Sequence, residues 1–201
     1  MRLTTGGTIA AAAIALAAVL ASCEQNTAHG KVAAARARAQ VVFAARELYQ
    51  TLVKTSARSV DILDAAYTPC GSGKTTLSYS ISLRLFAFTA DQNTDFDAYR
   101  HQVVTLVRGE GWTLRRRPPS RSVTLPEVPS AYYWLSKREG ELSLSGALGL
   151  VGDPNPLVGV SGTLSVNGPC FDADGAAGSL QSQPVSPTFP LPSPSPSPSH
   201  S

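Results

Sequence analysis

The sequence predicts one α+β domain, in which an antiparallel sheet of four or five strands carries two helices on one face and is held by one disulfide. Three observations lead to this expectation. An early proline-free stretch has apolar residues at helical spacing, and several later segments alternate apolar and polar residues as half-exposed strands do. A second amphipathic segment lies between the first strand and the others. We place the domain at residues 31–171.

Residues 1–22 have the pattern of a lipoprotein signal peptide. Arg2 supplies a positive start, and the apolar run Ile9–Ala21 is shorter than the ~20 residues of a membrane-spanning helix. Leu20-Ala21-Ser22-Cys23 resembles a bacterial lipobox, where a lipid is attached to the cysteine and the preceding peptide is removed. We therefore expect a lipid on Cys23 that holds the protein at the extracytoplasmic face of the cell membrane. In the alternative, Cys23 is incidental and cleavage nearby releases a soluble protein.

The next segments are a tether and a helix. Residues 23–30 are polar and predict a short tether, whereas Lys31 to about Ser56 is rich in alanine and arginine. Its apolar residues recur every three or four positions, which predicts an amphipathic helix. The basic side of this helix could lie on anionic lipid. We favour the other interpretation, a core-facing helix whose arginines are solvated.

Residues 77–88 alternate between apolar and polar side chains, which is the strongest strand pattern in the chain. A helix follows, opened by Thr94 with Asp97 three residues later and ended by Gly109 or Gly111. Another strand begins at Trp112 and stops before two prolines.

A strand meander completes the domain. It comprises Ala131–Lys137, Leu142–Leu150 and Val158–Val166, and Gly146 and Gly162 within it suggest bulges or a closely packed helix. Residues 172–201 show no apolar periodicity and end in alternating proline and serine. They predict a disordered tail that is dispensable for folding.

The remaining cysteines predict a disulfide. Once Cys23 carries lipid, Cys70 and Cys170 are left as a pair in an oxidising compartment. Their bond would close a loop of about 100 residues and contribute roughly 4–5 kcal/mol in the chain-entropy model. The spacing of the cysteines fits no zinc motif, so we predict no metal site.

Two common binding functions are not supported. Gly71-Ser72-Gly73-Lys74-Thr75 is similar to the end of a nucleotide-binding P-loop, but Thr68 occupies the position of the first glycine and a strand follows instead of a helix. We interpret it as a flexible turn that binds no nucleotide. The net charge of +3 is too small to indicate nucleic-acid binding.

Catalytic motifs are sparse. His101 is the single histidine within the predicted domain, and it lies outside the apolar stripe of its helix. Gly159-Val160-Ser161-Gly162-Thr163 lacks the final glycine of a nucleophile elbow. Residue spacing places no pair of carboxylates as acid and base. We predict no catalytic residue and no cofactor.

The candidate partner-binding residues are basic. Arg115, Arg116, Arg117 and Arg121 form the densest basic patch, which could contact anionic headgroups or wall polymers or could protect a sheet edge. On a strand, alternate arginines would face opposite sides. Tyr132-Tyr133-Trp134 could form an aromatic cluster that binds carbohydrate or protein. On a strand two of the three must share a face, so we expect at least one to pack in the core.

Together these features resemble small actinobacterial lipoproteins of unknown function. The resemblance is carried by the lipobox, the arginine-rich first helix, Cys70 before a long strand, Gly111-Trp112 after a helix, and Gly168-Pro169-Cys170. It implies an envelope location and no defined activity. We expect a non-enzymatic binding or structural protein whose partner is an envelope protein or polymer. A hydrolase or transferase acting on envelope polymers, with a site assembled in space, is the alternative.

Overall fold

The computed structural model describes residues 8–53, 59–73, 75–87, 96–118, 128–140, 142–152, 159–182, 187 and 189, with side chains from Ala28 onward. The helical elements are α1 (Thr8–Val53), α2 (Phe96–Gly109), η1 (Asp174–Ala176) and α3 (Ala177–Gln181). The strands are β1 (Ser59–Pro69), β2 (Thr76–Ala87), β3 (Thr113–Arg117), β4 (Ser130–Glu139), β5 (Leu142–Gly152), β6 (Val160–Asn167) and β7 (Phe171–Asp172).

These strands form one antiparallel sheet in the order β1-β2-β6-β5-β4-β3, with β7 also paired to β2. The α+β prediction is confirmed, and the sheet has more strands than expected. The additional strands are β1 and β7. A register shift between Ile62 and Asp64 interrupts the alternation of β1, and β7 is only two residues long, so neither has a clear sequence pattern.

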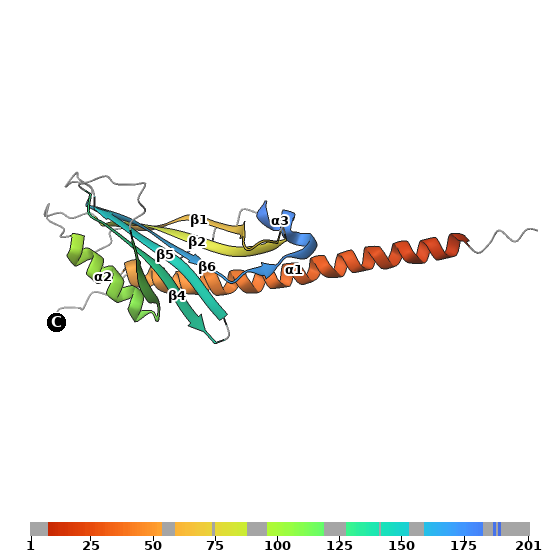
Figure 1. Ribbon diagram of the computed structural model, residues 1–201, viewed down its shortest axis with the longest axis horizontal. Coiled ribbons are helices and arrows are strands. Elements are labelled where there is room, and N and C mark those ends of the chain that lie inside the picture. Colours follow the sequence, from red (N-terminus) through yellow and green to blue (C-terminus); the bar gives the residue numbers. More distant parts are fainter. Residues whose placement is uncertain are drawn as a thin grey trace, which may run out of the picture.

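Helices α1 and α2 pack on the same face of the sheet, and α1 runs beneath the strands and projects beyond them (Figure 1). In β2, the odd-numbered residues from Leu77 to Ala87 are buried against this helical layer. The apolar stripe of α1 meets them, with Val41, Leu48 and Leu52 fully buried. The predicted core-facing orientation of the first helix is therefore correct for this side of α1. The opposite face of the sheet carries no helix in the described part of the chain (Figure 1). The even-numbered residues of β2 point to this face.

The two glycines within strands have a different role from the expected one. The strand register is continuous through Gly146 and Gly162, so neither marks a bulge. A Cβ at Gly146 would overlap the carbonyl oxygen of Ser165 on the neighbouring strand, and one at Gly162 would lie 2.7 Å from Leu150 Cδ2. Close contact within the sheet therefore excludes a side chain at these positions, and no helix is involved.

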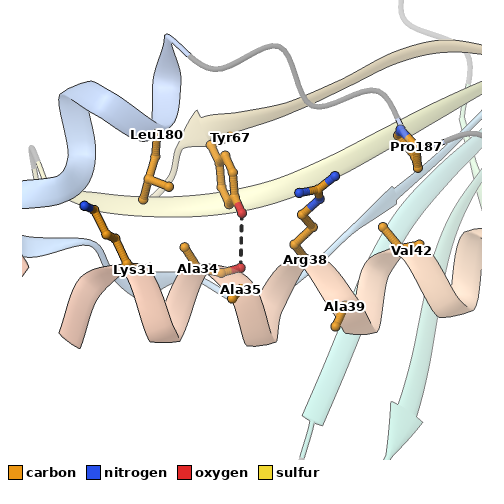
Figure 2. A pocket seen from close by; sticks show the side chains of 9 residues that line it. All are labelled: Lys31, Ala34, Ala35, Arg38, Ala39, Val42, Tyr67, Leu180 and Pro187. Atoms are coloured by element: carbon orange, nitrogen blue, oxygen red, sulfur yellow. Dashed lines mark hydrogen bonds between the residues drawn. The ribbon is translucent and has the colours of Figure 1, made fainter. Parts of the chain in front are cut away.

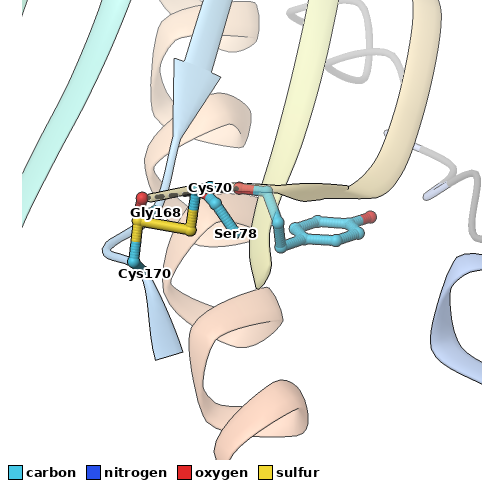
Figure 3. Close-up of a disulfide and its surroundings, with 5 residues drawn as sticks. Cys70, Ser78, Gly168 and Cys170 are labelled. Atoms are coloured by element: carbon cyan, nitrogen blue, oxygen red, sulfur yellow. Dashed lines mark hydrogen bonds between the residues drawn. A yellow bond between two sulfur atoms is a disulfide. The ribbon is translucent and has the colours of Figure 1, made fainter. Parts of the chain in front are cut away.

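The predicted disulfide is confirmed. Cys70 and Cys170 are bonded, and their Cα atoms are 6.0 Å apart (Figure 3). Beside the bond, the Ser78 hydroxyl donates a hydrogen bond to the Gly168 carbonyl at 2.9 Å. The covalent bond and this hydrogen bond join the β1–β2 hairpin to the segment after β6.

Two predicted domain boundaries are wrong. Residues 23–30, expected to be a tether, continue the helix α1. Residues that follow Phe171, expected to be a tail, contribute β7, η1 and α3, and Ala173, Ala176 and Leu180 are buried. Farther along, Phe189 is buried with its ring 5.4 Å from that of Tyr49. Isolated apolar residues were enough to dock this segment, although they have no periodicity. The proline-serine run from residue 190 lies outside the described residues.

Candidate functional site

The uncovered face of the sheet carries a row of side chains that runs across five strands. Residues that pair directly across antiparallel strands point to the same face. The register aligns them in the order Arg84 (β2), Thr163 (β6), Gly149 (β5), Tyr132 (β4) and Arg117 (β3). At a strand spacing of about 4.8 Å, the backbones at the two arginines are roughly 19 Å apart. Within these five strands the row has an arginine at each end, with Thr163, Gly149 and Tyr132 between them. Asp61 of β1 pairs beyond Arg84.

A second row lies beside the first. It consists of Ser82, Ser165, Ala147, Trp134 and Arg115 in the same strand order. The Trp134 side chain is 52% exposed, and the Arg117 guanidinium from the first row lies 4.6 Å from the centre of its ring. This stacking holds a cation over an exposed aromatic surface. We call the ten residues of the two rows the transverse rows.

The predicted basic patch is divided by this geometry. Arg115 and Arg117 belong to the uncovered face, whereas Arg116 pairs with Tyr133 and points toward the helical side. Arg121 lies outside the described residues. The expectation that alternate arginines face opposite sides is confirmed for the three that the structure describes.

The aromatic triplet is divided in the same way. Tyr132 and Trp134 are on the uncovered face, and Tyr133 is buried on the other. The Tyr133 hydroxyl accepts a hydrogen bond from Arg100 of α2 at 3.2 Å, and Arg100 also forms an ion pair with Asp97. Tyr133 therefore contributes to packing between helix and sheet, and the other two aromatic residues are available to a ligand.

A shallow depression of about 390 Å³ lies beside the first row, between it and the neighbouring residues Phe86, Ser161 and Val151, on the side away from Trp134. Its floor is formed by Gly149, Ser161 and Thr163, and its sides include the rings of Tyr132 on β4 and Phe86 on β2. A Cβ at Gly149 would lie 3.3 Å from the Tyr132 ring, so the glycine keeps the floor low beside that ring. The Arg84 guanidinium lies 5.7 Å from the Phe86 ring centre. The depression thus combines aromatic surfaces, hydroxyl groups and a cation.

Charge on the uncovered face is asymmetric. Among the described residues of β3, β4, β5 and β6, no acidic side chain points to this face, whereas Arg115, Arg117 and Arg138 do. The carboxylates of this face come from β1, where Asp61 is opposite Arg84 and Asp64 is opposite Ser82, and from β7, where Asp172 is opposite Thr76. The half of the face around Trp134 is therefore wholly cationic.

Two further grooves flank α1. The larger, of about 600 Å³, lies between α1 and Tyr67, with Lys31, Arg38, Leu180 and Pro187 around it (Figure 2). The Tyr67 hydroxyl donates to the Ala34 carbonyl at 3.2 Å, and burial raises the pKa of Tyr67. This hydroxyl is therefore occupied in joining β1 to α1. The other groove, of about 460 Å³, includes His29, Val32 and Arg36 on the opposite side of α1.

The other sequence motifs do not assemble a catalytic centre in the described residues. His101 is exposed on α2 and lines none of the three depressions. The glycine-rich segment closes the β1–β2 hairpin, with the Cys70 amide donating to the Thr76 carbonyl at 3.0 Å, so it is the turn expected before a strand. Lys74 lies outside the described residues. Those residues contain no cluster of three metal-ligating side chains, and no helix among them is long and apolar enough to cross a membrane.

Sequence reasoning missed Arg84, Phe86 and the small residues of β5 and β6 as parts of the surface. The alternation of residues 77–88 already placed Arg84 on the polar side of its strand. What was lacking was the strand order, which aligns Arg84 with Tyr132 across two intervening strands. The chain matches no protein-family model, and no curated protein or solved structure matches it.

Proposed function

We propose that this protein is a lipid-anchored extracytoplasmic lipoprotein that binds an extended anionic envelope polymer across its uncovered sheet face without catalysing a reaction. The transverse rows are the observation that carries this proposal. They offer arginines roughly 19 Å apart, the exposed Trp134 ring, the half-buried Tyr132 ring and a line of hydroxyl-bearing or small residues between the arginines. An elongated ligand with repeated negative charges matches that layout.

The side chains favour a glycan over other anionic polymers. Aromatic rings such as those of Tyr132 and Trp134 offer flat apolar surfaces against which the C–H faces of sugar rings can pack. The Thr163 hydroxyl can exchange hydrogen bonds with sugar hydroxyls. The Ser165 hydroxyl, which accepts from the Ala147 amide at 3.1 Å, can still donate one. The guanidinium groups of Arg115 and Arg117 can bind carboxylate or phosphate groups in the bidentate manner typical of arginine.

The lipid anchor is supported by the cysteine chemistry. Cys70 and Cys170 are bonded to each other, so Cys23 is the one cysteine of the three left for modification. Metabolic labelling with a palmitate analogue tests the anchor. We expect Cys23→Ala to lose the label and to leave the membrane fraction, whereas Cys70→Ala, the matched control, should keep the label. A labelled Cys23→Ala protein would disprove the anchor.

Polymer binding is tested with glycans of defined charge. We expect the purified protein to bind alginate oligosaccharides, which combine sugar rings with carboxylates, and to bind neutral dextran or ring-free polyglutamate much more weakly. Trp134→Ala should reduce alginate affinity roughly tenfold, because an aromatic contact of about 1.5 kcal/mol is lost. Arg84→Gln/Arg117→Gln should weaken binding and reduce its salt dependence.

The controls separate this surface from the rest of the molecule. Arg108→Gln removes an exposed cation from α2 on the other side of the sheet, and it should leave alginate binding unchanged. Equal binding of alginate and polyglutamate would show that sugar rings are not recognised. Capture of an envelope protein with no glycan affinity would favour the protein partner instead.

The alternative of an envelope-polymer hydrolase or transferase receives less support. General acid–base hydrolysis of a glycan requires two carboxyl groups that face each other across the bond to be cleaved. The residues that line the three depressions include no carboxylate. Release of reducing ends from alginate by the purified protein would restore the enzymatic alternative.

A further inference from the structure

Helix α1 has a second side that points away from the core. Val32 and Arg36 on this side border the groove of about 460 Å³, whose other wall includes Leu142 and Pro169. Its inner side supplies Val41, Leu48 and Leu52 to the core. On the opposite side Val32 is 67% exposed and Phe43 is 56% exposed, with the exposed Arg36 between them in the sequence. The spacings of four and seven residues place these three on one stripe of a helix. We call Val32, Arg36 and Phe43 the outer face of α1. Lys31 lies roughly 100° around the helix from Val32, beside the groove of Figure 2.

The charge of this half of the helix has one sign. Residues 25–46 contain no aspartate or glutamate, although they contain Lys31, Arg36, Arg38 and Arg46. Arg38 lines the groove of Figure 2, and the Arg46 guanidinium lies 6.0 Å from the centre of the Phe189 ring. Lys31 and Arg36 are the cations at the end of α1 nearest Cys23. The first acidic residue that follows, Glu47, forms an ion pair with Lys137 at 3.0 Å.

We propose that the outer face of α1 lies on the anionic headgroups of a lipid bilayer. Exposed large apolar side chains together with uncompensated cations are the two components with which a helix binds at a membrane interface. Val32 and Phe43 enter the boundary between headgroups and acyl chains, and Lys31 and Arg36 bind the phosphates beside them. Because Lys and Arg have long apolar stems, their charged ends can reach the headgroups from the margin of the helix.

This arrangement also orients the polymer site. The transverse rows belong to the sheet face that α1 does not cover (Figure 1), and Val32 and Phe43 of the outer face are exposed, unlike the side of α1 that packs on the sheet. A bilayer beneath α1 therefore leaves the uncovered sheet face directed away from the membrane. In this respect the inference deepens the proposed function. The lipid on Cys23 would be about 12 Å from Lys31 along the helix, so lipid and outer face can reach the same surface.

Vesicle co-sedimentation of the processed chain without its lipid tests the proposal. The protein would comprise residues 23–201 with Cys23→Ser, because the buried hydrophobic side chains of the described core begin at Ala34. We expect binding to phosphatidylcholine vesicles that contain phosphatidylglycerol and little binding to phosphatidylcholine alone. Lys31→Gln/Arg36→Gln should weaken binding to the anionic vesicles roughly tenfold to thirtyfold. Val32→Ser/Phe43→Ser should weaken binding to the anionic vesicles at high salt as well as at low salt.

The matched control removes the same charge from the other side of the molecule. Arg115→Gln/Arg117→Gln should leave vesicle binding unchanged, and the α1 variants should keep the parent's melting temperature and alginate affinity. The proposal fails if the parent does not bind anionic vesicles, or if the sheet variant loses as much binding as the α1 variant. A parent dimer that becomes monomeric in Val32→Ser/Phe43→Ser would also overturn it, because the occupant would be a second copy of this chain. Alginate binding reports separately on the proposed function.

Discussion

The two faces of the sheet use the same strands for different purposes. On the helix-covered face, β2 alone contributes Leu77, Tyr79, Ile81, Leu83 and Leu85 as fully buried side chains. On the uncovered face, the same strand presents serines, Arg84 and Phe86. Because side chains alternate along a strand, a single segment of sequence can build a core and a surface at once. The covered face therefore contributes most of the buried apolar surface, and the uncovered face carries the side chains of the proposed polymer site. Four predictions test this division.

The largest expected effect comes from removing the C-terminal cover. A chain that ends at Phe171 loses the buried side chains of Leu180 and Phe189, which together correspond to about 5 kcal/mol of apolar burial. We expect a large fall in melting temperature, measured by circular dichroism. A chain that ends at Pro190 retains these contacts and should melt like the full protein. If both truncated chains melt alike, the covered face does not depend on this segment.

Single core and surface changes on adjacent residues of β2 provide the next test. Leu83→Ala should destabilise the protein by about 3 kcal/mol, because the lost side chain is fully buried and leaves a cavity. Ser82→Ala, one residue earlier on the uncovered face, should change the free energy of unfolding by less than about 0.5 kcal/mol. Urea denaturation measures both values. Similar losses would contradict the division between the faces.

Alkaline pH should destabilise the covered side through Tyr99 of α2. Burial raises the pKa of Tyr99 to about 12 from 10.0, and its hydroxyl has no hydrogen-bond partner among the described residues. The unfolded chain therefore releases this proton first, and stability falls as pH rises from about 10 to about 12, by up to about 3 kcal/mol. Tyr99→Phe should remove that part of the decline. Melting curves against pH for parent and variant measure it, and parallel curves would show that Tyr99 does not contribute.

The smallest expected effect lies on the uncovered face. Arg117→Gln removes the cation stacked on the exposed Trp134 ring, and such exposed pairs contribute about 0.5–1 kcal/mol. We expect a change in melting temperature of no more than a few degrees. We expect the same substitution to reduce alginate affinity by a larger factor than it reduces the equilibrium constant for folding. A variant that unfolds readily would show that this face has a structural role.

The local pattern of the sequence was enough to predict much of the covered face. Alternation in residues 77–88 and helical spacing after Lys31 identified β2 and the described part of α1 that packs on the sheet. The disulfide was predicted because the lipobox assigned the third cysteine to another role. These features depend on neighbours within a few residues or on counting residues of one type, and both are visible in a single sequence.

Tertiary structure alone decided the remaining features. The bulge in β1 hides its period, and the segment after Phe171 docks through scattered residues such as Leu180 and Phe189, which have no pattern of their own. The transverse rows depend on strand order and register, because Arg84 and Arg117 are brought into line by three intervening strands. For the strands with a regular alternation, such as β2, the sequence by itself determined which side is polar. Long-range strand pairing decided which polar residues lie next to one another on the sheet, because register joins residues that are far apart in the chain.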